Sequence, residues 1–560
     1  MKKRLVCILL GLALAISVTA CGNQSRTNTA EQVQDEVQES TQTQSTELEI
    51  EGASYISLSD EEITIDGDSV TTNTEEAVYV ANDIVYYEEG KDFTYGEGTA
   101  EEAHSKEEAE KHTVVHITKP GTYVLSGKLE AGQIAVDLGE DAKDDPEAVV
   151  TLVLNNMDIS CSVAPRVIFY NVYECSSSDE EEATKDVDTL AAGANVLIAD
   201  GTVNTVNGSY VAKIYKSVEL NEEGTEIVDS KKLHKYDGAF YSKMSMNING
   251  GELGNGVLNI NAENEGMDSE LHLTINGGKI NIVSGNDGIN TNEDNVSVTT
   301  VNGGTLSIKV DGSSGEGDGI DSNGWLVING GVVTASACAT SGDAGIDSDK
   351  GIHINGGAVV ATGNMLDHIS ESEQQFVVFT FRDKVKGGEE IILKKGEEST
   401  FVSMANDFAY LIISNPELTE GTYTLWRGDE QLSVIEMNGN MGGDGMMKPD
   451  GKLPEGMEPG QLPEGMEPGE RPEMPEGMEP GERPDLPEGM EPGERPEMPE
   501  GMEPGERPEL PEGMKEGKMP GGGRGGNGFG QMNLENTVTE FEIKAGSNMF
   551  MVVSDVTFQT

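Results

Sequence analysis

The chain has 560 residues, of which 70 are glycine, 36% are hydrophobic and 5% are aromatic. This composition is typical of a repetitive β structure with long polar segments rather than of one large globule. Lys and Arg number 37 against 101 Asp and Glu, which gives a formal charge of −64. Because so negative a chain repels phosphate, we exclude nucleic acid as a partner and expect cations instead.

The first twenty residues predict a lipoprotein signal peptide. Three basic residues at positions 2–4 precede an apolar run at 5–18, and residues 18–21 (Val-Thr-Ala-Cys) match a bacterial lipobox. We expect cleavage before Cys21 and acylation of its thiol, which would anchor the protein on the extracellular face of the cell membrane. We expect the mature chain to be anchored rather than to span the membrane, because no later apolar run is long enough to span a bilayer. An uncleaved transmembrane anchor is the alternative.

Residues 21–55 predict a disordered tether, because they are rich in Gln, Ser, Thr and Glu and lack apolar periodicity. Alternating strand patterns begin near residue 56, and two long segments, 166–192 and 207–236, interrupt them. Within these segments we expect exposed loops at Ser176–Asp188 and Asn221–Lys232. Insertions at equivalent corners of a repeat gather on one side, often the binding side, and the short insertion Asp311–Gly317 also lies at such a corner.

Cys7 leaves with the expected signal peptide and Cys21 takes the lipid, so three cysteines keep unmodified thiols: Cys161, Cys175 and Cys338. An odd number argues against a complete disulfide framework. A bridge between Cys161 and Cys175 and burial of both as free thiols remain open.

The stretch from Asp237 to Gly363 contains an internal repeat. The phrase Ile-Asn-Gly-Gly or a near copy begins at Ile248, Ile275, Val301, Ile328 and Ile354, at intervals of 27, 26, 27 and 26 residues. A second phrase, Gly-Ile-Asp-Ser or a near copy, begins at Gly266, Gly288, Gly319 and Gly345. Residues between the phrases alternate in polarity, which indicates strands. A unit this short cannot bury its own apolar face, so we predict that residues 56–370 stack as coils of a parallel β-helix.

The asparagines of the first phrase predict a ladder. Equivalent amides would lie one above another and hydrogen-bond along the stack, while the adjacent glycines form the turn. Direct contact of these amides with a ligand is the alternative. The residues concerned are Asn249, Asn276, Asn302, Asn329 and Asn355.

The second phrase brings oxygen ligands into register, and these are our candidate metal site: Glu265, Asp268, Asp287, Asn290, Asp318, Asp321, Asp343 and Asp347. Carboxylates about 4.8 Å apart repel by roughly 3 kcal/mol at an effective dielectric constant near 20, and a bound cation removes this repulsion. Oxygen ligands without clustered His or Cys favour Ca²⁺ over zinc. A solvated acidic rim with diffuse counter-ions is the alternative.

After residue 370 the repeat ends. Runs at 376–381, 390–393, 408–414 and 421–427 predict a small antiparallel β domain over residues 371–440. Residues 441–534 contain repeats of the type PEGMEPGERP, whose Pro and Gly favour an extended spacer. The pattern returns to strands at 535–560, so we interpret the spacer as an overgrown loop within this second domain.

Carbohydrate sites often present a flat aromatic ring surrounded by polar groups. We place Trp325 on the outward face of a coil, in register with Val298 and His272, and regard Trp325 and His272 as candidate carbohydrate ligands. A simple surface hydrophobe is the alternative for Trp325. For Trp426 we expect a core position.

The run at 116–127 (HITKPGTYVLSG), the run at 151–159 (TLVLNNMDI) and the two repeat phrases resemble a family of secreted clostridial-type carbohydrate-binding domain-containing proteins. The resemblance implies a right-handed parallel β-helix similar to pectate lyases, with calcium between coils and binding to polysaccharide such as cellulose or pectin. The chain departs from the family pattern in its two long inserted segments and at Asn290, where neighbouring repeats have Asp.

From these observations we expect a monomeric cell-surface lipoprotein that binds acidic or neutral polysaccharide without catalysis. A calcium-dependent pectate lyase is the first alternative, but residues 237–370 contain no Arg to act as its base. A hydrolase would need a single pair of catalytic acids, whereas the acids of the second phrase recur from coil to coil. A calcium-stiffened spacer or adhesin is the second alternative.

Overall fold

The computed structural model describes residues 48–370, 372–437 and 536–553. Helix within these ranges is limited to α1 (Lys106–Ala109) and the 3-10 helix η1 (Glu140–Asp144), and nearly all other regular structure is strand. The predicted all-β class is therefore confirmed. The predicted signal peptide with Cys21, most of the predicted tether and the predicted spacer at 441–534 lie outside the described residues. None of the described helices has the length and apolar character needed to cross a membrane.

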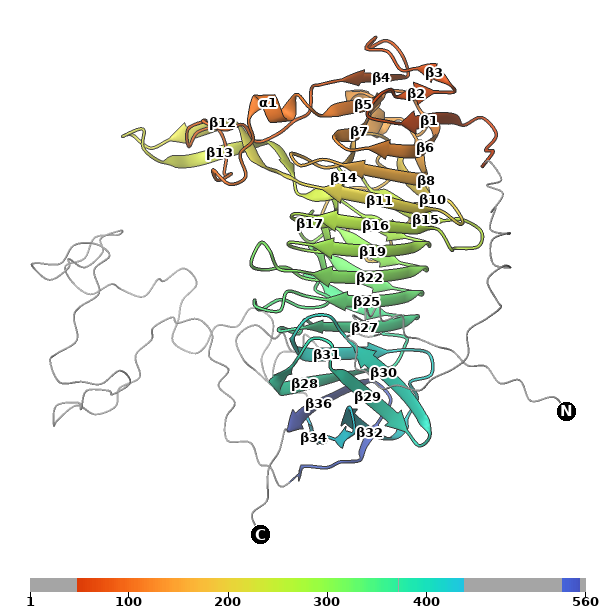
Figure 1. Ribbon diagram of the computed structural model, residues 1–560. Helices are drawn as coiled ribbons and strands as arrows, with labels where there is room; N and C mark the ends of the chain where they lie inside the picture. Colours follow the sequence, from red (N-terminus) through yellow and green to blue (C-terminus); the bar gives the residue numbers. More distant parts are fainter. Residues whose placement is uncertain (1–47, 371, 438–535, 554–560) are drawn as a thin grey trace, which may run out of the picture. The chain divides into compact units, whose positions relative to one another are not determined.

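Three stacks of parallel strands form the body of the protein (Figure 1). The first contains β8 (Val150–Ser160), β10 (Ala194–Ile198), β15 (Met246–Gly250), β18 (Leu273–Ile275), β21 (Val298–Val301), β24 (Trp325–Ile328) and β26 (Gly351–Ile354). The second starts on the other half of β8 and continues through β11 (Val203–Gly208), β16 (Val257–Ala262), β19 (Lys279–Ser284), β22 (Thr305–Val310), β25 (Val332–Ser336) and β27 (Ala358–Gly363). The third contains β5 (Thr113–Ile117), β7 (Gly132–Asp137), β9 (Val167–Asn171), β14 (Gly238–Ser242), β17 (Glu265–Ser269), β20 (Ile289–Thr291) and β23 (Ile320–Ser322).

Alternation in these strands directs every second side chain into a common core. Ile280 and Ile282 of β19 pair with Leu306 and Ile308 of β22, and all four are buried. Full burial of one such side chain contributes roughly 1.5–3 kcal/mol. Each rung is therefore stabilised chiefly by its neighbours, as expected for short repeats.

The predicted asparagine ladder is present at the corners between the first and second stacks. Each Nδ2 donates to the Oδ1 one rung earlier, at 3.0 Å from Asn276 to Asn249, 2.9 Å from Asn302 to Asn276, 3.0 Å from Asn329 to Asn302 and 2.9 Å from Asn355 to Asn329. The second glycine of the phrase has a left-handed backbone, with φ of 83° at Gly304. A Cβ would be strained there, which explains why the phrase ends in glycine.

Antiparallel strands follow the parallel stacks at both ends. At the N-terminal end, β6 (Gly121–Leu129) pairs in parallel with β8 and with β1 (Ser54–Leu58), and β1 continues into the small antiparallel strands β2 (Thr64–Ile65) and β3 (Asp68–Ser69). Strand β4 (Val78–Ala81) runs antiparallel to β5. At the other end, β31 (Phe408–Ser414) runs antiparallel to β27.

The C-terminal strands enclose a second hydrophobic core containing Phe379, Phe408 and Phe550. The four runs predicted as strands in this region are strands. The elements are β28 (Phe376–Val385), β29 (Glu390–Lys395), β30 (Glu398–Ser403), β32 (Gly421–Arg427), β33 (Glu430–Gln431), β34 (Ser433–Glu436), β35 (Phe541–Ile543) and β36 (Ser547–Val553). Strands β35 and β36, which follow the predicted spacer in sequence, pair with β32, β28 and β34.

The inserted segment 207–236 differs from its prediction. We expected an exposed loop at Asn221–Lys232, but the chain forms a hairpin of β12 (Val211–Leu220) and β13 (Ile227–Tyr236) that extends away from the stacks in Figure 1. The mixed charges of this segment suit a hairpin with two solvated faces, and its short turn leaves few residues for a loop. The predicted loop Ser176–Asp188 is mostly exposed and contains no strand.

The three described cysteines are free thiols. Cys161 and Cys338 are buried and Cys175 is half-buried. Of the two possibilities left open for Cys161 and Cys175, the structure therefore has the unbridged one.

The ladder generates a stability prediction. Asn302 makes two ladder hydrogen bonds, and Asn355, at the end, makes one. A typical hydrogen bond contributes about 0.5–1.5 kcal/mol, so Asn302→Ala should lower the free energy of unfolding about twice as much as Asn355→Ala. Denaturant unfolding of both variants measures this, and equal losses would contradict an energetic role for the ladder.

Candidate metal centre

The acids of the second phrase lie on adjacent rungs of the third stack. Asp268 pairs with Asn290, and Asn290 pairs with Asp321. Asp347 continues the series, because its backbone N–H donates to the carbonyl of Ile320 at 2.7 Å. The register predicted from the repeat is therefore present, and it places carboxylates of successive coils close together.

Three acids form a compact buried group: Asp237, Glu265 and Asp268. One carboxylate oxygen from each lies within 4.8 Å of the others. Asp237 lies between β13 and β14. Glu265 and Asp268 both belong to β17 and are three residues apart. Their exposed fractions are 5%, 4% and 0%. Carboxylates are almost never buried to this extent unless a cation or strong hydrogen bonds compensate them.

Hydrogen bonds satisfy only part of this group. Lys235 Nζ lies 2.7 Å from Asp237 Oδ2, Asn292 donates to Asp268 Oδ1 at 2.6 Å, and Asn290 donates to Glu265 Oε1 at 3.2 Å. Three buried oxygens have no partner: Glu265 Oε2, Asp268 Oδ2 and Asn290 Oδ1. An unpartnered buried acceptor costs about 1–3 kcal/mol, and a cation among these oxygens would remove that cost.

The electrostatics of the group also favour a bound cation. Burial, and then repulsion by neighbouring carboxylates, hold the pKa of Glu265 and of Asp268 well above the usual range. Burial also raises the pKa of Asp237, although the Lys235 ammonium opposes this shift. One ammonium faces three carboxylates, so a divalent cation would balance the remaining charge and displace the protons that the metal-free group holds.

The donor set indicates which metals fit. Asp237, Glu265, Asp268 and Asn290 offer only carboxylate and amide oxygens, the ligands of hard cations. Oxygens around a Ca²⁺ ion lie about 2.3–2.6 Å from it and hence at most about 5 Å from one another. The spacing within this group is compatible with that limit. The buried acidic cluster could therefore hold a metal ion.

The other predicted ligands divide into two sets. Asp287, Asp318 and Asp343 each accept a hydrogen bond from a backbone N–H of a neighbouring rung, donated respectively by Asp318, Ala344 and Gly317. These three therefore join rungs through the backbone and lie outside the compact group. Asp321 and Asp347 form a separate acidic pair, in which burial and neighbouring carboxylates raise each pKa to about 7.

Sequence reasoning missed Asp237, Lys235 and Asn292. Asp237 stands immediately before a glycine, as do Glu265, Asp287 and Asp318, and this acid–glycine pattern could have identified it. In the structure, however, Gly238 rather than Asp237 pairs with Glu265. The side chain of Asp237 therefore joins the group from just before the strand, and no repeat spacing predicts that position.

Of the two candidate carbohydrate ligands, Trp325 has the predicted register and His272 is placed differently from our expectation. Trp325 pairs with Val298 as predicted, but Lys350 Nζ lies 4.9 Å from the centre of its half-buried ring. His272 is only 2% exposed, and its Nδ1 accepts a hydrogen bond from the Val298 N–H at 3.0 Å. His272 therefore presents no free surface to a glycan, which corrects its placement on an exposed face. Trp426 is half-buried beneath Lys394, whose Nζ lies 4.0 Å from the ring centre.

Comparison with known proteins gives one family match. The family model described as carbohydrate-binding domain-containing protein matches residues 111–430. Among solved structures, the chain is similar to the polysaccharide lyase-like protein from C. thermocellum, a gadolinium derivative, with 18% sequence identity and a TM-score of 0.30. The alignment covers 57% of this chain and 92% of that chain. No curated protein matches the sequence.

The pKa shifts of these carboxyls predict how the stability of the protein depends on pH. The pKa is about 7 for Asp321 and Asp347 and about 9 for Asp318, against an ordinary value of 3.8. A carboxyl whose pKa is higher in the folded chain stabilises the fold fully below its unfolded pKa, and this contribution is lost as the pH rises towards the folded pKa. A rise from 3.8 to about 7 corresponds to roughly 4 kcal/mol between the two protonation states.

We therefore expect the metal-free protein in chelator to unfold at progressively lower temperature between pH 4 and pH 7. Adding Ca²⁺ or Mg²⁺ should restore more stability at pH 7 than at pH 4. Melting curves across this range measure both effects. A melting temperature that rises with pH in chelator would show that these carboxyls are not destabilised by ionisation.

A second prediction concerns the compact group itself. Glu265→Gln keeps the shape of the side chain and removes a ligand charge, so divalent-metal affinity measured by calorimetric titration should fall at least about tenfold. Glu252→Gln, at an exposed position outside the group, is the matched control and should leave affinity unchanged. Equal affinities for wild type and Glu265→Gln would place the metal elsewhere.

Proposed function

Because the chain belongs to the carbohydrate-binding domain-containing protein family, we propose that it binds polysaccharide through a calcium-stabilised, right-handed parallel β-helix. In this proposal it does not cleave the bound chain. The observation that supports it most directly is the buried group of Asp237, Glu265 and Asp268, with carboxylate oxygens that lack partners.

Calcium suits this group better than magnesium. Ca²⁺ accepts six to eight oxygens in flexible geometry, whereas Mg²⁺ requires a near-ideal octahedron and keeps several waters. Asp237, Glu265, Asp268 and Asn290 would hold the ion, which would neutralise their charge and lock adjacent rungs together. The rigid rungs would then present a fixed surface to a glycan.

The polysaccharide is of plant type or a similar acidic or neutral polymer, with cellulose and pectin as the model ligands. A chain of formal charge −64 repels an acidic polymer at long range. Bridging by a divalent cation would overcome this repulsion locally. An acidic ligand would therefore bind in a calcium-dependent manner.

We propose that the protein does not cleave its ligand because, among the described residues, no suitable basic residue lies beside the acidic group. A calcium-dependent lyase needs a basic residue beside the metal to remove a proton. The sequence between residues 237 and 370 contains no Arg, and Lys350 lies over the ring of Trp325. Lys235 is the one observation that favours a lyase as second candidate, because its ammonium lies beside the acidic group. Its ion pair with Asp237 keeps the pKa of Lys235 raised, which opposes a role as base.

The cellular location follows from the N-terminal sequence. We propose cleavage before Cys21, lipid attachment to its thiol, and display of the monomeric protein on the extracellular face of the membrane. The negative charge of the chain keeps it from anionic lipid surfaces, so the lipid alone would hold it there.

Binding can be tested by retention on insoluble cellulose and on pectin gel, with and without chelator. We expect retention on pectin that chelator abolishes, and loss of that retention in the variant carrying both Glu265→Gln and Asp268→Asn. Retention insensitive to chelator and to the double substitution would refute the calcium part of the proposal. Lack of retention on every polysaccharide would favour the spacer or adhesin alternative.

Catalysis can be tested in the same preparation. Incubation with polygalacturonate and Ca²⁺ should give no increase in the absorbance of unsaturated uronate. An increase that disappears in Lys235→Met would establish the lyase in place of the binding protein.

A further inference from the structure

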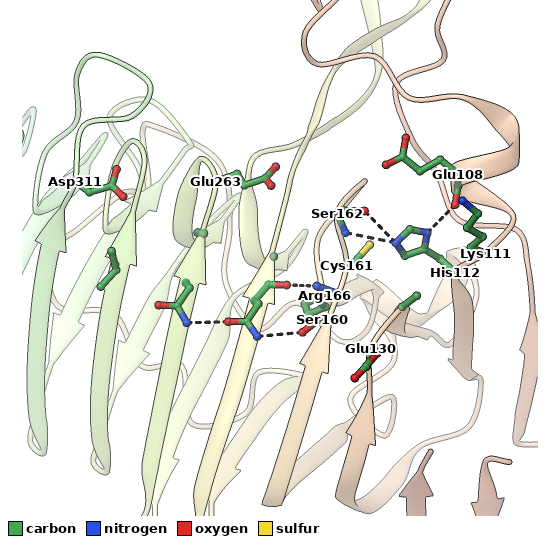
Figure 2. Close-up of a pocket in the computed structure, with 16 residues that line it drawn as sticks. Glu108, Lys111, His112, Glu130, Ser160, Cys161, Ser162, Arg166, Glu263 and Asp311 are labelled. Carbon is green, nitrogen blue, oxygen red and sulfur yellow. Dashed lines mark hydrogen bonds between the residues drawn. The ribbon is translucent and has the colours of Figure 1, made fainter. Parts of the chain in front are cut away.

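An open groove of about 690 Å³ crosses the ends of the strands that lead from the second stack into the third. Its lining residues lie at or just after the ends of β6, β8, β11, β16, β19 and β22, which are successive neighbours. Helix α1 and the residues after it close one end. In Figure 2, Asp311 and Glu263 lie towards one end of the groove, and Glu108, Lys111 and His112 lie at the other. None of Asp237, Glu265 and Asp268 lines it.

A polar ladder forms the floor of this groove. Asn207 Nδ2 donates to Ser160 Oγ at 3.0 Å, and Asn261 Nδ2 donates to Asn207 Oδ1 at 2.8 Å. Asn261 is exposed, so one amide at the end of the ladder faces solvent. Side-chain amides both donate and accept, which is the pairing that sugar hydroxyls require.

Buried Arg166 supports the ladder from below. Its guanidinium is 1% exposed and donates to the carbonyls of Gly132, at 3.0 Å, and of Asn207. Asn207, whose carbonyl accepts from Arg166, is also the central member of the ladder. Arg166 Nε is buried without an acceptor, although the side chain lines the groove.

The charges around the groove select the kind of ligand. Four carboxylates line it, those of Glu108, Glu130, Glu263 and Asp311, against the cations Lys111 and Arg166. The excess of negative charge disfavours an acidic ligand, whereas carboxylates accept hydrogen bonds from neutral hydroxyls. Glu263 already accepts such a bond, from the hydroxyl of Ser209 at 2.7 Å.

We propose that this groove is a second glycan site, which binds an extended chain of neutral, hydroxyl-rich sugars independently of the metal centre. The inference rests on the proposed polysaccharide binding and assigns it a place and a sugar class. Five steps of about 4.8 Å between six strand ends make the groove roughly 24 Å long, which suits an oligosaccharide rather than a single sugar. Its volume lies within the range of small-ligand sites, about 300–1,000 Å³.

The positions of the insertions point to the same groove. The inserted segments 207–236 and 311–317 begin at Asn207 and Asp311, and both residues line it. The sequence predicted that insertions at equivalent corners mark the binding side. In the structure both segments begin at this groove, and the end of the longer one, at Lys235, reaches the metal centre.

The test uses the full chain in chelator, so that glycan binding that depends on the metal does not contribute to the measurement. The probes are hexasaccharides of β-1,4-linked glucose, mannose and xylose, with a galacturonate hexasaccharide as the acidic counterpart. We expect at least one neutral hexasaccharide to bind in calorimetric titration and Asn261→Ala to weaken that binding about tenfold. Asn281→Ala is the matched control, because Asn281 is an exposed ladder asparagine on neighbouring β19 that bonds to Asn259 and does not line the groove.

The outcomes separate this inference from the proposed function. If the protein is retained on polysaccharide but hexasaccharide binding is absent, or is equal in Asn261→Ala and wild type, the groove proposal fails and polysaccharide binding stands. If the galacturonate hexasaccharide binds in chelator and Glu263→Gln tightens it, the neutral ligand class is wrong. If no glycan binds under any condition, both proposals fail together.

Discussion

The spacing of paired strands, about 4.8 Å, is the constraint on which this molecule depends. Strand pairing brings equivalent positions of successive repeats to the same place on adjacent rungs, so a residue that recurs in the repeat lies against a copy of itself. Isoleucine at such a position packs on isoleucine and contributes to the core. Asparagine donates to asparagine, as Asn302 does to Asn276, and satisfies both polar groups.

Aspartate at a repeated position has no such solution. Two ionised carboxylates cannot hydrogen-bond to each other, and burial deprives them of water. The chain responds in two ways. Asp287 and Asp318 accept from backbone N–H groups of the next rung, whereas Glu265 and Asp268 retain oxygens without partners. The backbone hydrogen bonds of Asp287 and Asp318 join neighbouring rungs, whereas the unpartnered oxygens of Glu265 and Asp268 could bind a cation.

Much of this arrangement could be predicted from the sequence because it follows from periodicity. The corner phrase predicted the Asn249 to Asn355 ladder, and the second phrase predicted that Asp268, Asn290 and Asp321 share a register. Asp237 escaped prediction although it is the first residue of the repeat stretch. Gly238, not Asp237, pairs with Glu265, so the repeat spacing does not place the side chain of Asp237.

His272 shows the same limit in another form. Alternation placed it correctly on the outward side of its strand but could not say what covers that side. The inserted segment 166–192 contacts positions one rung earlier: Glu174 accepts a hydrogen bond from the hydroxyl of Ser245, and Thr189 donates to Asn247 at 2.7 Å. An outward position is thus an exposed one only where no insertion folds back over the stack.

The reversal of strand direction at β31 has a consequence for how molecules of this type meet one another. A stack that ended on β27 would offer a bare parallel rung, which is a template for the first rung of another copy and so for growth into fibres. Because β31 runs antiparallel to β27, the terminal rung no longer repeats the translation that relates the coils. The number of stacked rungs is thereby set within one molecule, and the strand that ends the parallel stack also contributes to the second core.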